Sequence, residues 1–303
     1  MRRTVLFLLI FVTRVFAENA YHEEISVDVV NVFALARDSK GKIVRDLRSD
    51  EITVLENGVS QSIVDISNFA NDQTNKLSAE DFPLSVTFAL DTSASMDSSY
   101  NNKKRIEIAK YAVLMLMEEL KKEDKMMLAS FSRYPKTLTE MTSDKQRVED
   151  LLLLERPMNE KTAIYDSLSD VLDRMQNSQG TKILVLCTDG EDNSSRMNFT
   201  SFLNKIAGMD VLVLAFTIPS GASLQNQYEI KKIAEITGGY AFFPTSVEEL
   251  KDILAQLKHT IRNQYSIWYR TSNNGKDGNW RDIQILCHRP GIELYHRPGY
   301  FAR

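Results

Sequence analysis

Short apolar segments without polar alternation recur between residues 83 and 262, and segments with helical spacing separate them. The clearest apolar segments are Leu84–Leu90 and Ile183–Cys187, and apolar residues recur at helical spacing in Ile106–Leu120. A strand that is apolar on both sides must be covered on both faces, and parallel neighbours need long crossover connections. The pattern therefore predicts an α/β fold, a Rossmann-like doubly wound and mostly parallel sheet with helices on both faces.

Strand and turn signals flank this α/β region on both sides. In front of it, Ile52–Leu55 has a strand pattern and is followed by Asn57 and Gly58, a strong hairpin signal. Behind it, Tyr265–Tyr269 and Trp280–Leu286 have strand patterns. Each flank alone has too few strands to be stable. We therefore expect the two flanks to form one small, sandwich-like β-rich domain with the α/β domain inserted between them.

The first residues have the layout of a secretory signal peptide. Arg2 and Arg3 give a positive start, Val5–Val12 is an unbroken apolar run, and Ala17 is a small residue at the expected cleavage point. The run is far shorter than the roughly 20 apolar residues of a membrane span, and no later segment is apolar enough. An uncleaved anchor or a buried first strand is the alternative interpretation. The sequence thus predicts an exported protein, periplasmic or extracellular.

The expected parts of the chain follow from these boundaries. They are a signal peptide (1–17), the front part of the β-rich domain (18–72), a polar linker (73–82), the α/β domain (83–262) and the rear part of the β-rich domain (263–303).

Composition argues against several functions. The net charge is only -4, and no basic stripe is interleaved with aromatic residues, so nucleic acid is a poor candidate partner. Two cysteines and four scattered histidines do not make a Cys/His zinc site of familiar spacing. Export permits a disulfide between Cys187 and Cys287. Two buried free thiols are the simpler interpretation.

Five side chains with oxygen ligands fall at the ends of the expected elements. Asp91, Ser93 and Ser95 follow the first apolar strand, Asp189 follows a later one, and Thr162 precedes a helix. Ligands of open parallel sheets bind beyond the carboxyl ends of the strands. Oxygen ligands suit a hard cation such as Mg²⁺, and two carboxylates balance its charge. Taken singly, these residues could be helix caps or a plain turn, but together they predict a divalent-cation site.

The same residues resemble the metal-ion-dependent adhesion site of von Willebrand factor A and integrin I-type domains. The resemblance rests on the motif Asp91-x-Ser93-x-Ser95, on Thr162 and on Asp189. It covers about residues 83 to 262. The wider matching segments are Phe88–Met96, Lys161–Leu168 and Leu184–Gly190. Many bacterial members of the family have Gly where this chain has Ala94, so the loop shape is expected to differ slightly.

The flanks are similar to those of a bacterial group often called VWFA-related proteins. In front, the similarity rests on Val54–Gly58. Behind, it rests on Tyr265–Tyr269, Asp277–Trp280 and Arg297–Tyr300. Members of this group are known mostly from sequence, so the similarity implies little about a partner.

The family resemblance implies how an ion would be held. The hydroxyls of Ser93, Ser95 and Thr162 would bind Mg²⁺, or Mn²⁺ or Ca²⁺, directly, and Asp91 and Asp189 would act mainly through water. A direct shell poor in negative charge leaves the ion electrophilic. An Asp or Glu carboxylate of a partner protein can then complete it.

Two further acids lie near the motif. Asp97 could belong to a second cation site, as in some integrins, or could be a solvated loop acid. Asp166 lies one turn after Thr162 and is expected to cap or brace the loop, although it could act as a base if a substrate bound.

The leading functional prediction is a non-enzymatic, metal-dependent protein-binding module. A metal-dependent hydrolase is one alternative, but no histidine lies in the sheet-edge motifs, so a hydroxyl nucleophile has no obvious base. The other alternative is a structural domain of an envelope assembly whose metal only stabilises the fold. The sequence does not indicate an oligomeric state.

Overall fold

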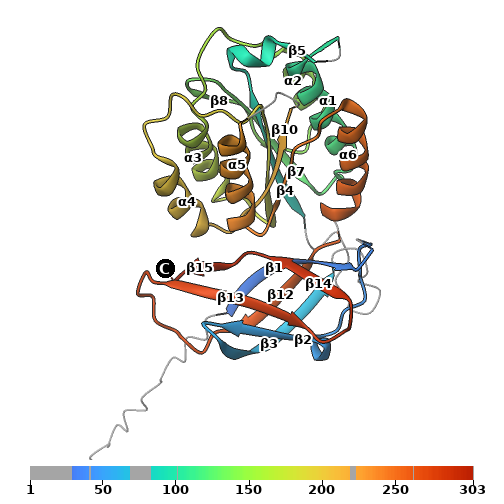
Figure 1. Cartoon of the computed structure of the whole chain (residues 1–303), viewed down its shortest axis with the longest axis vertical. Coiled ribbons are helices and arrows are strands. Elements are labelled where there is room, and N and C mark those ends of the chain that lie inside the picture. The colour runs from blue at the N-terminus through green and yellow to red at the C-terminus, as the bar shows by residue number, and fades with distance from the viewer. Residues whose placement is uncertain are drawn as a thin grey trace, which may run out of the picture.

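A computed structural model describes residues 29–40, 42–68, 83–100, 102–218, 223–261 and 263–302. These residues form two domains that lie end to end, an α/β domain and a β-rich domain (Figure 1). The predicted signal peptide (1–17), the start of the front flank (18–28) and the predicted linker (73–82) lie outside the described residues.

A six-stranded sheet forms the centre of the α/β domain. Its strands are β4 (Leu84–Asp91), β7 (Lys125–Phe131), β8 (Pro135–Thr142), β9 (Thr181–Thr188), β10 (Leu212–Thr217) and β11 (Tyr240–Phe242). Their order is β11-β10-β9-β4-β7-β8. All neighbours are parallel except β7 and β8, which pair antiparallel at one edge. The predicted mostly parallel sheet is confirmed, and β4 and β9 lie at its centre.

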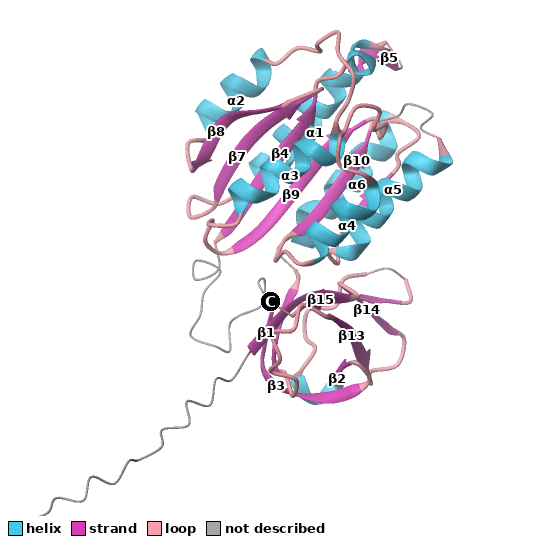
Figure 2. Ribbon diagram, turned by 90° about the vertical axis from the view of Figure 1, so that its left-hand side faces the viewer, coloured by secondary structure: helices cyan, strands magenta, loops and turns pink. Residues whose placement is uncertain are grey.

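Helices cover both faces of this sheet (Figures 1 and 2). One face packs against α1 (Arg105–Glu118), α2 (Lys145–Leu154) and α6 (Val247–Ile261), and the other against α3 (Ile164–Met175), α4 (Phe199–Ala207) and α5 (Leu224–Ile236). Every residue of β4 is buried between the two layers, which explains why that strand has no polar alternation. The short elements are η1 (Ser49–Glu51), η2 (Ala94–Asp97), β5 (Ser99–Tyr100) and β6 (Lys103–Lys104).

Besides the short elements η2, β5 and β6, the sequence interpretation missed one strand and one helix of the α/β domain. Strand β8 is rich in Thr, Lys and Glu, because an edge strand is half exposed and does not need a continuous apolar run. Helix α4 has only nine residues. The Asn198 side chain caps its N-terminus by accepting a hydrogen bond from the Ser201 backbone N–H (2.9 Å), and Gly208 follows its last residue.

Both flanks contribute strands to one antiparallel sheet, which is the β-rich domain. Its strands are β1 (Val29–Asp38), β2 (Ile52–Glu56), β3 (Val59–Asn68), β12 (Tyr265–Arg270), β13 (Trp280–Cys287), β14 (Ile292–His296) and β15 (Gly299–Phe301). The order is β14-β1-β12-β3-β2-β13-β15, so β12 of the rear flank lies between two strands of the front flank. Figure 2 shows that the sheet curls round its own apolar core. The expected β-rich domain of both flanks is confirmed, and its strands form one curled sheet instead of the two sheets of a sandwich.

The predicted hairpin at Asn57 and Gly58 joins β2 to β3. Both residues have positive φ angles, 49° and 79°, as a tight two-residue hairpin turn requires. Asn57 also exchanges two hydrogen bonds with Asp282 on β13, each of 2.8 Å. The turn of the front flank is therefore tied directly to the rear flank.

The two cysteines lie in different domains and are both free. Cys187 is buried in β9, and Cys287 is partly exposed at the end of β13. The disulfide is therefore excluded, and only one of the two thiols is buried. Within the described ranges, no helix has the length and apolar character needed to cross a membrane.

Aromatic and basic side chains form the junction of the two domains. The guanidinium of Arg37, on β1, lies 5.5 Å from the ring centre of Tyr240 and 5.8 Å from that of Tyr295. Gly238 lies so close to the β-rich domain that a Cβ atom there would be 2.5 Å from the backbone nitrogen of Arg297. The contacts of Arg37 with the two tyrosines and the close packing at Gly238 hold the two domains together near the C-terminal end of α5.

His296, next to this junction, is held as a neutral imidazole. Its Nε2 accepts a hydrogen bond from the Ile285 backbone N–H (3.1 Å), so that nitrogen carries no proton. Its Nδ1 lies 2.7 Å from the Arg297 carbonyl oxygen, to which it can donate. Burial lowers the pKa of His296 below its usual value. Protonation of Nε2 would break the bond to Ile285.

We therefore expect acid to destabilise the β-rich domain through His296. Below the ordinary pKa of about 6.5 the unfolded chain binds a proton that the folded chain does not, so stability falls with pH, by at most about 1.4 kcal/mol per pH unit, until the folded-state pKa is reached. The measurement is the urea midpoint at pH 7.5 and 5.5 for the native chain and for His296→Gln. The native chain should lose more stability on acidification than the variant does; equal losses would exclude this role of His296.

Candidate metal-ion site

Asp91 is the last residue of β4, and its carboxylate is fully buried. It accepts hydrogen bonds from the Ser93 backbone N–H (2.8 Å) and from the hydroxyl of Thr188, the last residue of β9 (2.6 Å). The carboxylate is thus fixed where the two central strands end, at the carboxyl edge of the sheet.

The hydroxyls of Ser93 and Ser95 lie together beside Asp91. Their Oγ atoms are 3.1 Å apart. Two adjacent ligands of an octahedral Mg²⁺ at about 2.1 Å from the ion would be about 3.0 Å apart. Ser93 precedes η2, but its side chain makes no capping hydrogen bond there. The pair therefore has ligand spacing without a capping role.

Thr162 lies in the loop before α3, and hydrogen bonds join this loop to the other two segments of the site. The Ala94 backbone N–H donates to the Glu160 carbonyl (3.1 Å). Thr162 and Asn193 exchange two hydrogen bonds, from the Thr162 N–H to Asn193 Oδ1 (2.9 Å) and from the Asn193 N–H to the Thr162 carbonyl (3.0 Å). Since Asn193 follows β9, these bonds bring the loop of Thr162 to the edge where Asp91 and Asp189 lie.

Thr162 does not cap α3. The N-cap position is Ala163, whose side chain makes no cap. The backbone N–H groups of Ile164 and Tyr165 donate instead to Asp192 Oδ2, at 2.6 and 3.3 Å. Asp192 was missed by the sequence interpretation, although it lies only three residues after Asp189. The structure thus removes the interpretation of Thr162 as a simple helix cap.

Asp189 directly follows β9 and is buried beside a positive charge. Arg105 Nη1, at the start of α1, donates to Asp189 Oδ2 (3.3 Å) and to the Ser95 carbonyl (3.2 Å). Burial and, second, the charge of Asp189 raise the pKa of Asp91 to about 7. The Arg105 guanidinium balances only one of the two neighbouring carboxylate charges. The site therefore favours the binding of an added cation.

The two accessory acids have different surroundings. Asp97 is exposed on η2 and forms an ion pair with Lys104 Nζ (2.6 Å). Asp166 accepts hydrogen bonds from the backbone N–H groups of Arg196 (2.8 Å) and Met197 (3.0 Å), so it braces the loop after β9, as expected. Over the described ranges, neither carboxylate is hydrogen-bonded to the five candidate ligands. Asp97 thus has the surroundings of a solvated loop acid, which was the alternative to a second cation site.

The chemistry of these groups fits a hard divalent cation. The five side chains offer only oxygen, from two carboxylates and three neutral hydroxyls. Within the part of the chain that the structure describes, no three His, Cys, Asp or Glu side chains gather as a metal cluster.

A family model described as the von Willebrand factor type A domain matches residues 86–191. This segment is a von Willebrand factor A domain. The match includes all five candidate ligands, Asp91, Ser93, Ser95, Thr162 and Asp189. Among curated proteins, none matches this sequence.

Solved structures with TM-scores of 0.50 and above share the fold at low sequence identity. Proximal thread matrix protein 1 from the mussel byssus, described with a zinc-occupied MIDAS motif, is 18% identical with a TM-score of 0.52 over 62% of this chain and 48% of its own. A von Willebrand factor type A protein from Catenulispora acidiphila is 12% identical with a TM-score of 0.50 over 91% of this chain and 73% of its own. BatB, a conserved hypothetical protein of Bacteroides thetaiotaomicron, is 20% identical with a TM-score of 0.49 over 59% of this chain and 100% of its own.

Proposed function

We propose that the von Willebrand factor A domain binds one divalent cation and uses it to bind an Asp or Glu carboxylate of another protein. Mg²⁺ is the expected ion, and Mn²⁺ or Ca²⁺ could replace it. Ser93, Ser95 and Thr162 would supply direct hydroxyl ligands, and Asp91 and Asp189 would act through water. The observation that carries this proposal is the Ser93–Ser95 hydroxyl pair beside a buried carboxylate, because neither hydroxyl caps a helix.

The charges around the site favour an anionic ligand. Asp91 and Asp189 contribute two negative charges, and Arg105 contributes one positive charge next to Asp189. A divalent ion therefore leaves the site with a net charge of about +1, which one further carboxylate would neutralise. The three hydroxyl ligands alone do not fill the coordination shell of Mg²⁺, so a coordination position is available to that carboxylate.

Exposed apolar side chains at the same edge of the sheet indicate a protein partner. Tyr134 follows the end of β7 and is 61% exposed, and Leu224 at the start of α5 is 85% exposed. Met158, before α3, and Tyr228, on α5, are also exposed. Exposed large apolar side chains are contacts that a protein partner can use, and aromatic side chains are frequent anchors at interfaces.

Binding is favoured over catalysis by what surrounds the ligands. The two histidines whose side chains the structure describes, His288 and His296, belong to the β-rich domain. Asp166, the other candidate base, is engaged with backbone N–H groups. The proposed setting is the periplasm or the extracellular space, in keeping with the predicted signal peptide.

Thr162→Ala tests the proposal. We expect it to weaken binding of the acidic partner by about 2–5 kcal/mol, the usual cost of breaking a close charge contact at an interface, while the fold is retained. The partner is first retained from envelope extract in Mg²⁺ and released by chelator, and its affinity is then measured by calorimetry. Thr181→Ala is the matched control, because Thr181 lies at the opposite end of β9 and is similarly buried (7% exposed, against 3% for Thr162).

The outcome separates three functions. Replacement of the critical partner Glu or Asp by Gln or Asn should weaken binding as Thr162→Ala does, and the two losses should not add. Full affinity in chelator would exclude the ion as the bridge and favour a purely structural metal. Loss of turnover on a substrate would favour a hydrolase.

A further inference from the structure

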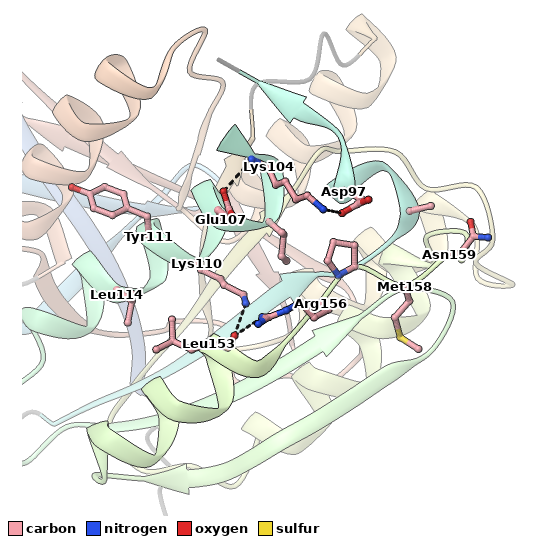
Figure 3. Close-up of a pocket in the computed structure, with 13 residues that line it drawn as sticks. Asp97, Lys104, Glu107, Lys110, Tyr111, Leu114, Leu153, Arg156, Met158 and Asn159 are labelled. Atoms are coloured by element: carbon pink, nitrogen blue, oxygen red, sulfur yellow. Dashed lines mark hydrogen bonds and ion pairs between the residues drawn. The ribbon is translucent and has the colours of Figure 1, made fainter. Parts of the chain in front are cut away.

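A groove begins at the proposed ion site and runs between α1 and the segment after α2 (Figure 3). Its volume is about 700 Å³, within the range of about 300–1,000 Å³ that is common for binding pockets. Ala94 and Asn159 line one end, and Ala94 stands between the proposed ligands Ser93 and Ser95. A peptide segment whose carboxylate reached the ion could therefore continue into this groove.

Two basic side chains lie in the groove and donate to backbone carbonyls, and the charges of the Glu107 and Glu155 carboxylates also act on Lys110. Lys110 Nζ donates to the carbonyls of Leu153 (2.9 Å) and Glu155, and Arg156 Nη1 donates to the same two carbonyls. Among the described residues, neither cation is hydrogen-bonded to a carboxylate. Burial and, second, the positive charge of Arg156 lower the pKa of Lys110, as expected for two cations that share neutral acceptors.

The basic side chain at the mouth of the groove is already paired. Lys104 pairs with Asp97 (2.6 Å), and its backbone N–H donates to Glu107 (3.2 Å). Figure 3 shows these contacts beside the basic pair of Lys110 and Arg156. The positive charge open to an anionic side chain in the groove is therefore that of the basic pair and not that of Lys104.

Apolar side chains line the end of the groove farther from the ion. Tyr111 and Leu114 project from α1, and Leu153 belongs to α2 (Figure 3). Tyr111 and Leu153 are exposed although both are large and apolar. They offer contact area to an apolar side chain of a ligand.

The helix rise gives the spacing of these features. Arg105 touches Asp189 at the ion site, and a rise of about 1.5 Å per residue places Lys110 about 7.5 Å and Leu114 about 13.5 Å farther along α1. An extended peptide advances about 3.3 Å per residue. The basic pair thus corresponds to about two to three residues of peptide, and the apolar end to about four.

We propose that the groove binds an extended segment of the acidic partner, with a second Asp or Glu two to three residues from the ion-bound carboxylate and an apolar residue about four residues from it. The segment contacts the basic pair with its second carboxylate and Tyr111, Leu114 and Leu153 with its apolar side chain. This inference rests on the proposed function, because the first carboxylate is the one that the ion binds.

The test is a selection of phage-displayed random dodecapeptides on the full chain in Mg²⁺, followed by elution with chelator. We expect eluted peptides to share two acidic residues at this spacing and a following apolar residue. Eluted peptides with a single acidic residue would overturn the groove proposal but not the proposed function. Absence of any chelator-eluted peptide would overturn both.

Charge variants then locate the second contact. Arg156→Gln, at an exposed position, should weaken the selected peptide several-fold, and Lys110→Gln with Arg156→Gln should weaken it about tenfold, equivalent to about 1.4 kcal/mol. Arg147→Gln removes the same charge from α2 outside the groove and should leave the affinity unchanged. Replacement of the second acidic residue of the peptide by its amide should cost little further affinity in the double variant. Unchanged affinity in Arg156→Gln and in the double variant would overturn the proposal.

Discussion

Mg²⁺ or Mn²⁺ added in large excess to the ion-free protein should raise its melting temperature by about 5–10 °C, and a chelator should reverse the shift. An ion that binds only the folded state stabilises it by about 2.7 kcal/mol at 100 times its dissociation constant. A domain of this size gains about 2–4 °C per kcal/mol. Differential scanning calorimetry with and without the ion measures the effect.

Asp91→Asn should abolish this shift. The amide keeps the shape of the side chain but removes one of the two buried charges, so the ion-free variant should melt at the same temperature as the native chain or above it. Asp97→Asn is the control, because Asp97 is exposed and paired with Lys104, and it should keep the full shift. A native-sized shift in Asp91→Asn would exclude the proposed site.

Glu56→Ala should destabilise the β-rich domain by about 3–5 kcal/mol, because it leaves several buried hydroxyl groups without an acceptor. Glu56, the last residue of β2, is 2% exposed. Its carboxylate accepts hydrogen bonds from the hydroxyls of Tyr269 (2.7 Å), Thr271 (2.7 Å) and Tyr300 (3.0 Å). The front flank is therefore joined to the rear flank through one buried carboxylate.

Tryptophan fluorescence during urea unfolding measures this loss. The chain has two tryptophans, Trp268 and Trp280, and both lie in the β-rich domain, so their signal follows that domain alone. Glu56→Gln keeps a carbonyl acceptor and should cost less than Glu56→Ala. If Glu56→Ala lost less than about 1 kcal/mol, the hydroxyl cluster would not be a main link between the flanks.

Local signals in the sequence were sufficient to predict the fold class of each domain. Continuous apolar strands such as β4 are buried on both faces, so their composition alone indicates a covered parallel sheet. The Asn57–Gly58 turn was predictable because few residues adopt its positive φ angles. The sequence could indicate that Asp91 and Asp189 lie near each other because strand ends of a parallel sheet meet at one edge, and their role as ion ligands stays a prediction.

The tertiary structure decided what depends on contacts between distant residues. The sequence does not state that β12 lies between β1 and β3, because strand pairing follows from packing and not from local pattern. The contacts of Arg105 with Asp189 and of Tyr269 with Glu56 join residues 84 and 213 positions apart. Asp192, in another loop, caps the N-terminus of α3 in place of a residue next to the helix. In each case a buried polar group is hydrogen-bonded to a residue that is distant in the sequence. Burial determines where such partners are needed, and the burial of a residue depends on the whole fold and not on its own segment.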